Sequence, residues 1–143
     1  MTKLNESIMP AKFLAVICQV VMNITILYTH KQNVYSSFDY PISDSDSDFE
    51  EADRSLLACA VISLLLLGVE ILVLFSGLSL FYDHANIVEI VLHCLGVIIT
   101  CWFILDDWRY SGLWGIWAFT VLIPFIIEVG IVINSKQLYN SQD

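Results

Sequence analysis

Positive charge is scarce in this sequence of 143 residues, where six Lys and Arg side chains stand against fifteen Asp and Glu. So few basic residues form no patch that could bind nucleic acid, and we expect no nucleic-acid partner. Seven of the acids lie between Asp39 and Asp53, so the net charge of -9 describes one acidic segment more than an evenly acidic surface.

Signatures of catalysis and cofactor binding are absent from the sequence as well. It contains no glycine-rich phosphate loop, no dinucleotide fingerprint, and no Ser/His/Asp or Cys/His set at a plausible spacing. The three histidines are too few for a membrane di-iron enzyme, and only His93 lies in an apolar segment. We therefore expect a protein that is not an enzyme, with no catalytic residue, no metal and no cofactor.

The cysteines lack the spacing of a zinc site and do not lie in loops, where a disulfide framework would form. They are Cys18, Cys59, Cys94 and Cys101, each within an apolar segment. This pattern predicts buried free thiols that act as small hydrophobic side chains.

Long apolar runs are what the sequence has in abundance, with 57% hydrophobic residues and a mean hydropathy of +0.73. A helix needs about 20 mostly apolar residues to cross a bilayer. The windows that qualify cover residues 11–29, 55–81, 87–105 and 113–133. We predict an all-α membrane protein, a single domain over residues 1–143, with four transmembrane helices in an antiparallel bundle. Loops two and three are short, and loop one, residues 30–54, is longer and acidic.

The lengths and composition of the loops support two further predictions. The short second and third links predict that the helices they join are antiparallel neighbours. The acidic loop is interpreted as a solvated connector in which Asp53 or Ser55 caps the second helix. Weak cation binding is one alternative, although the glycine turn and final Glu of an EF-hand are missing. Phosphorylation of the loop serines is the other.

Orientation follows from the basic residues near the helix ends. An even number of spans places both termini on one side of the membrane, and the Lys and Arg count is equal on the two sides. Lys3 and Lys12 flank the first helix, which favours cytosolic termini because positive residues near the first span usually stay inside.

Each predicted span carries one narrow face of polar or small residues. In the second span Ser63, Glu70 and Gly77 repeat every seven residues. The corresponding positions elsewhere are Gln19 and Asn23, then Glu89, His93, Gly96 and Thr100, then Thr120, Pro124 and Glu128. Polar side chains in hydrocarbon pair across helices, and small ones let backbones approach. The interhelical candidates are Gln19, Ser63, Glu70, Gly77, His93, Gly96, Pro124 and Glu128.

Four of these candidates, Gln19, Glu70, His93 and Glu128, are predicted to share one layer beside the second loop. The first interpretation is an interhelical hydrogen-bond cluster with at least one Glu protonated. Proton or cation handling by a small carrier or channel, and a buried metal site, are the alternatives.

From about residue 11 to residue 133 the sequence resembles the transmembrane protein 107 family, whose members are four-span proteins of the ciliary transition zone. The residues that carry the resemblance are Asn33-Val34, Val69-Glu70, residues 75–81 (FSGLSLF), His93-Cys94, Phe103-Ile104, Asp106, Trp108, Trp114, Pro124 and Glu128. Asp106, Trp108 and Trp114 are the candidate loop residues. Glu89 departs from the pattern, which leads us to expect a small or uncharged residue there.

The resemblance implies a non-enzymatic protein, with cytosolic termini, at the base of the cilium. There it would help to assemble the MKS module with tectonics and other multispan proteins, in contact with membrane lipids. It would thereby control the protein composition of the ciliary membrane and support ciliogenesis and cilium-dependent signalling.

Overall fold

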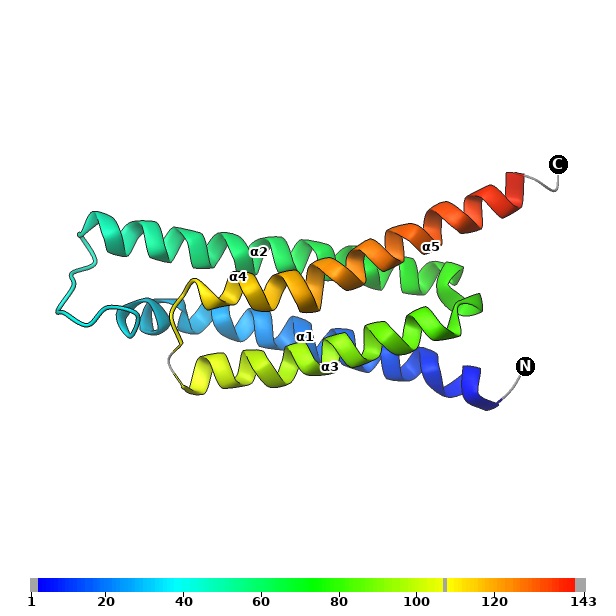
Figure 1. The fold of residues 1–143 in the computed structure, drawn as a ribbon, viewed down its shortest axis with the longest axis horizontal. Helices are drawn as coiled ribbons and strands as arrows, with labels where there is room; N and C mark the ends of the chain where they lie inside the picture. The colour runs from blue at the N-terminus through cyan, green and yellow to red at the C-terminus, as the bar shows by residue number, and fades with distance from the viewer. Residues whose placement is uncertain (1–2, 107, 141–143) are drawn as a thin grey trace.

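The structure is a computed structural model that describes residues 3–106 and 108–140, so the predicted domain of residues 1–143 extends past it at both ends. The described elements are all helical: α1 (Lys3–Tyr35), α2 (Ser47–Ser76), the 3₁₀ helix η1 (Leu78–Phe81), α3 (Asp83–Leu105), α4 (Gly112–Trp117), the π-helical turn η2 (Ala118–Leu122) and α5 (Ile123–Asn140). The last three are continuous and together are called the fourth helix (Figure 1).

Within the described residues, four helices are long and apolar enough to span a membrane: Ser7–Tyr35, Ser47–Ser76, Asp83–Leu105 and Gly112–Leu138. This confirms the predicted all-α architecture with four transmembrane helices. The two ends of the chain and η1 lie at one end of the bundle, called here the terminal end, and loops one and three lie at the other, the loop end (Figure 1).

The structure contradicts the prediction that the short second loop joins two neighbouring helices. α1 packs along α2 and α3, and the fourth helix packs along the same two helices. α2 and α3 therefore occupy opposite corners of the bundle, and so do α1 and the fourth helix. The short link between α2 and α3 does not make them neighbours, because η1 carries the chain across the terminal end. A four-residue 3₁₀ helix covers about 8 Å.

Loop one is much shorter than the predicted residues 30–54, since α1 continues to Tyr35 and α2 already starts at Ser47. The N-cap position of α2 is Asp46, so the predicted caps Asp53 and Ser55 lie inside the helix. The part of the acidic stretch from residue 47 onward is helical because its inner face packs on α1. The Phe49 and Tyr35 rings lie 4.7 Å apart between centroids, and Asp53 forms an ion pair with His30.

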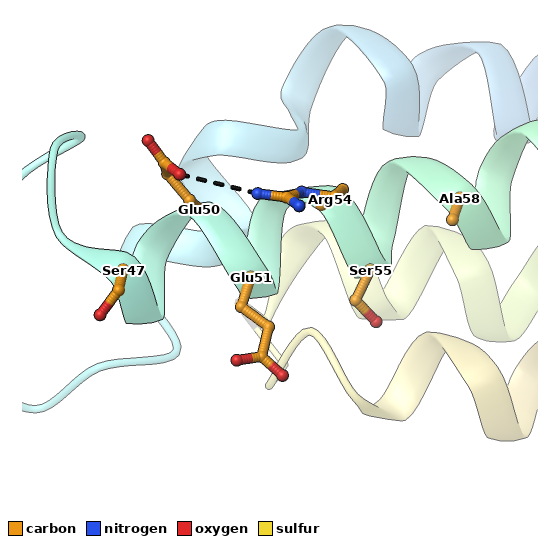
Figure 2. A pocket seen from close by; sticks show the side chains of 6 residues that line it. All are labelled: Ser47, Glu50, Glu51, Arg54, Ser55 and Ala58. Atoms are coloured by element: carbon orange, nitrogen blue, oxygen red, sulfur yellow. Dashed lines mark ion pairs between the residues drawn. The ribbon is translucent and has the colours of Figure 1, made fainter.

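The outer face of the first turns of α2 keeps the acidic character of the sequence. Figure 2 shows Glu50, Glu51 and Arg54 around a shallow surface hollow, with an ion pair of 3.6 Å between Glu50 and Arg54. At 1.5 Å per residue the 30 residues of α2 extend about 45 Å, which exceeds the roughly 30 Å of bilayer hydrocarbon. We infer that this acidic segment projects from the membrane as a helix.

An apolar cluster fills the loop end of the bundle. Its buried members are Ile26, Val34, Phe49, Ala52, Leu56, Cys59, Ala60, Phe103, Leu113 and Ile116. Cys59 is the one cysteine of this cluster, whereas Cys18, Cys94 and Cys101 are exposed on the outside of the bundle. The prediction of buried thiols was therefore wrong for three of the four, which face the lipid in a membrane-spanning bundle.

The end of α2 is set by Gly77, whose φ of 74° lies in the left-handed region. We predict that Gly77→Ala lowers the free energy of unfolding in detergent by about 1–2 kcal/mol, because a Cβ disfavours this conformation. Gly68→Ala is the matched control: its Cβ would meet nothing within 4 Å, and alanine in a helix interior is favoured by roughly 0.5–1 kcal/mol. Equal effects of the two substitutions in a denaturant titration would contradict this account.

Candidate functional site

Buried polar side chains concentrate in the half of the bundle at the terminal end, where all four helices contribute to them. In the described part of the chain the buried polar residues are Lys12, Gln19, Asn23, Asn33, Ser63, Glu70, Ser79, Asn86, Glu89, His93, Thr100, Thr120 and Glu128. Asn33 stands apart from the others, at the loop end of α1. Hydrocarbon supplies no hydrogen-bond partners, so each of these groups needs one inside the protein. Their contacts form two groups.

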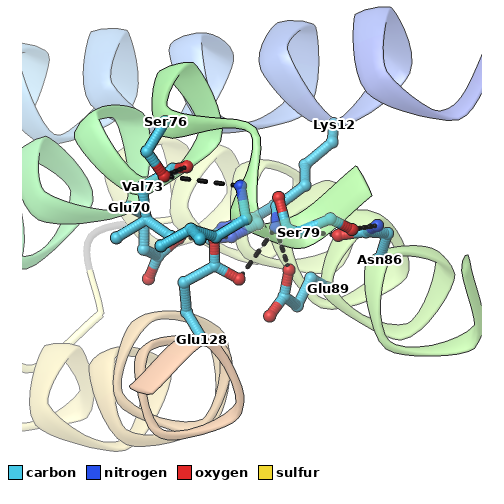
Figure 3. A network of polar contacts seen from close by, with 10 residues as sticks. Lys12, Glu70, Val73, Ser76, Ser79, Asn86, Glu89 and Glu128 are labelled. Carbon is cyan, nitrogen blue, oxygen red and sulfur yellow. Dashed lines mark hydrogen bonds and ion pairs between the residues drawn. The ribbon is translucent and has the colours of Figure 1, made fainter. Parts of the chain in front are cut away.

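The first group surrounds Lys12 of α1, which is fully buried. Its ammonium donates to Glu128 Oε2 and to Asn86 Oδ1, each at 3.0 Å, and forms an ion pair with Glu89 (Figure 3). Asn86 Nδ2 in turn donates to the backbone carbonyl of Ser79 at 2.7 Å. Lys12 thus joins α1 to α3 and α5, and Asn86 anchors η1.

The second group is centred on Gln19 and His93. Gln19 Nε2 donates to Thr120 Oγ1 at 2.9 Å, and the Thr120 hydroxyl donates to the Ile116 carbonyl at 2.8 Å. Gln19 Oε1 therefore faces His93 Nδ1, 3.0 Å away, and only an N–H on that ring nitrogen satisfies the contact. On the other side of the ring, His93 Nε2 lies 2.9 Å from Glu70 Oε2.

The contact between His93 and Glu70 allows the two side chains to be buried together without a net charge. With Nδ1 protonated, either Nε2 carries a second proton beside an ionised Glu70, or Nε2 is bare and Glu70 holds the proton. Both forms are neutral as a pair, which is the condition for burial in a medium of low dielectric constant.

The charges of the first group are not balanced within it. Lys12 is one cation beside two carboxylates, Glu89 and Glu128. In each carboxylate Oε1 is buried without a hydrogen-bond partner among the described residues. Leaving a net charge in hydrocarbon is costly, so the burial of Glu89 and Glu128 depends on the ammonium of Lys12.

Gly96 provides the room for the second group. A Cβ at this position would lie 2.5 and 2.6 Å from the amide atoms of Gln19 and 2.7 Å from Thr120 Cβ. Real Cβ atoms do not approach so closely, so a larger residue would displace Gln19. Glycine here lets the side chain of Gln19 cross between α3 and the fourth helix.

The fourth helix widens where it meets this group. In η2 the N–H of Ile123 bonds to the carbonyl of Ala118, five residues back. Pro124 follows, and because it has no N–H it leaves the carbonyl of Thr120 without its usual helical donor. The wider turn keeps both Thr120 and Val121 buried.

The predicted layer is divided between these two groups. Gln19, Glu70 and His93 are in direct contact, whereas Glu128 lies with Lys12. Ser63 is buried closer to the middle of the bundle and donates to Cys59 O of its own helix at 2.7 Å. The expectation for Gly77 was wrong, because Gly77 ends α2 instead of packing on its inward face.

The candidate loop residues lie at the loop end. Asp106 caps α3 and is exposed, and Trp108 lies beside Trp102 with 6.4 Å between ring centroids. Trp114 Nε1 donates to Ser55 Oγ at 3.0 Å and so links the fourth helix to α2. No cluster of three or more metal-ligating side chains forms within residues 3–106 and 108–140.

Comparison with known proteins shows which family the chain belongs to. The family profile TMEM107, described as transmembrane protein, matches residues 8–132. The chain belongs to the transmembrane protein 107 family. Transmembrane protein 107 of Rattus norvegicus is 26% identical over 128 residues, covering 90% of each chain. The Homo sapiens protein of that name is 24% identical over 129 residues, covering 90% of this chain and 91% of its own. The Xenopus laevis protein is 27% identical over 128 residues, covering 90% of each. No solved structure matches the chain.

The first group was missed by the sequence prediction, in which Lys12 was interpreted as a charge flanking the membrane. The signal was present, since Lys12, Gln19 and Asn23 follow one face of α1 at intervals of seven and four. Glu89, an unexpected acid for the transmembrane protein 107 family, needs a buried cation, and Lys12 is the basic residue within the predicted spans. The burial of Lys12 also affects the prediction of membrane orientation. A buried lysine does not flank the membrane, so it no longer counts as a positive charge that favours cytosolic termini. The remaining basic residues are Lys3 and Lys136 toward the terminal end, and Lys31, Arg54 and Arg109 toward the loop end.

We predict that Lys12→Met lowers the free energy of unfolding by about 3–5 kcal/mol, because it leaves Glu89 and Glu128 buried without their cation. Adding Glu89→Gln to Lys12→Met should recover part of this loss. The measurement is a denaturant titration of the purified protein in detergent.

The matched control is Lys31→Met, since Lys31 pairs with Asp44 at 3.1 Å on the surface. An exposed pair of this kind contributes about 0–1 kcal/mol. If Lys12→Met were no more harmful than Lys31→Met, the central role given to the Lys12 contacts would be wrong.

Proposed function

We propose that this protein is a non-enzymatic membrane component of the ciliary transition zone. In this role it helps to assemble the MKS module and to control which membrane proteins enter the cilium, supporting ciliogenesis and cilium-dependent signalling. The observation that carries the proposal is the family match over residues 8–132, together with the role that the resemblance implies. Four helices able to cross a membrane fit the multispan character that this role requires.

The interior of the bundle supports a structural role. The buried charges of Lys12, Glu89 and Glu128 are directed at one another, and Gln19 and His93 are held by contacts from neighbouring helices. Side chains engaged in this way hold helices in register. We therefore propose that the polar network specifies the bundle and that partners bind its outer surface.

Two outer surfaces are available to partners. The exposed helix faces are apolar, with Leu65, Leu72 and Ile98 among their large side chains, and they suit lipids and the transmembrane helices of tectonics or other multispan proteins. The acidic first turns of α2 (Figure 2) offer a charged surface at the loop end. With the cytosolic termini that the resemblance implies, this surface lies outside the cytosol.

A tagged copy expressed in ciliated cells is predicted to concentrate in a discrete spot at the base of each cilium. Fluorescence microscopy beside a basal-body marker measures this directly. An unrelated multispan protein with the same tag controls for the effect of the tag. A uniform signal over the plasma membrane or the endoplasmic reticulum would contradict the proposed function.

The buried titratable groups favour a second candidate, a small proton- or ion-handling carrier or channel. The contact between His93 and Glu70 could exchange a proton with the terminal end through the carboxylates around Lys12. Against conduction, the loop end beyond this network is filled by the apolar cluster that contains Leu56, Phe103 and Ile116. The first proposal is therefore preferred.

Reconstituted protein in liposomes separates the two candidates. A carrier would show pH- or ion-dependent flux that Glu70→Gln abolishes and Glu50→Gln, at an exposed position on α2, leaves unchanged. We expect no flux across a broad panel of ions from any of these proteins. Flux sensitive to Glu70→Gln alone would establish the carrier instead.

A further inference from the structure

A small cavity lies in the middle of the bundle, between the Gln19 and His93 group and the apolar cluster of the loop end. It offers about 10 Å³ of space for the centre of a water molecule. The polar residues around it are Gln19, Asn23, Ser63, Thr100 and Thr120, and Trp117 also lines it. All four long helices contribute to this lining, and most of it is polar.

One donor at the cavity has no partner. Trp117 Nε1 is buried, and no described residue accepts its hydrogen. By contrast, the indole N–H of the neighbouring Trp114 donates a direct hydrogen bond to Ser55 Oγ. Since a buried indole N–H normally finds an acceptor, the cavity is the place to look for the partner of Trp117.

Acceptors are also free around the same space. Asn23 uses Nδ2 to bond the Gln19 carbonyl at 3.0 Å, which leaves its Oδ1 unused. Ser63 donates its hydrogen to Cys59 O, so the lone pairs of its oxygen remain. The Thr100 hydroxyl makes no hydrogen bond within the described part of the chain.

We propose that this cavity is a binding site for a single structural water molecule, which accepts the indole hydrogen of Trp117 and donates to Asn23 and to Ser63 or Thr100. The space matches the roughly 10–15 Å³ that one water needs, and buried waters typically make about three hydrogen bonds. An empty apolar cavity stays dry, but this one is lined by the unpartnered indole N–H of Trp117 and by polar side chains with unused acceptor capacity. The water would tie three of the four helices together at the middle of the membrane: α1, the fourth helix, and either α2 or α3.

Nuclear magnetic resonance on the ¹⁵N-labelled, full-length protein in detergent micelles or nanodiscs tests this site. The signal of the Trp117 indole N–H is assigned by its loss in Trp117→Phe. We expect a cross-peak between this proton and the water resonance, with the sign of a water that stays bound for longer than nanoseconds. A wild-type protein with no such cross-peak would overturn the proposal.

Two substitutions of one residue then separate bound water from proton exchange through a hydroxyl. Ser63→Ala and Ser63→Val both remove the hydroxyl, but only valine fills the space. The cross-peak should remain in Ser63→Ala, where Asn23 and Thr100 still hold the water, and disappear in Ser63→Val. A cross-peak that persists in Ser63→Val would come from exchange through Thr100 and would also overturn the proposal.

Discussion

Burial of the Lys12 ammonium among carboxylates is the interaction on which the rest of the bundle depends. A cation in the hydrocarbon layer is tolerated only when countercharges meet it inside the protein. Glu128 and Asn86 each lie 3.0 Å from its nitrogen, and Glu89 completes the set. The contacts fix the position of α1 relative to α3 and α5, and through Asn86 they also fix η1.

Polar contacts reach across both diagonals of the bundle, in addition to those that join the neighbouring helices α1 and α3. Gln19 and Lys12 reach from α1 to the fourth helix at the opposite corner. His93 and Glu70 join α3 to α2 across the other diagonal. Long side chains are needed for these distances, and Gly96 supplies the space through which Gln19 passes. Because hydrophobic packing gives little discrimination between helix pairs in lipid, these diagonal contacts specify which arrangement of the four helices is adopted.

The sequence predicts the inward faces well, because a polar residue every three to four or seven positions marks one side of a helix whatever surrounds it. Glu70, His93, Gly96 and Glu128 are all buried for this reason. Periodicity does not reveal which helices occupy opposite corners, since that depends on the geometry of η1. For the same reason the predicted single layer became two groups. Lys12 was missed because a basic residue near a helix start resembles a membrane-flanking charge until its partners are known.

The distribution of polarity along the bundle bears on function. Titratable groups occupy the terminal half, and the loop half is filled by an apolar cluster whose outer edge carries the acidic turns of α2. A carrier would need polar groups that continue through both halves, so that an ion leaving one side could be received on the other. Here the buried polar groups thin out at Asn23, Ser63 and Thr100 in the middle of the membrane, and of the described residues beyond them Asn33 alone is polar and buried. An interior that is polar mainly on one side can hold the helices in place, and it leaves recognition of partners to the outer faces.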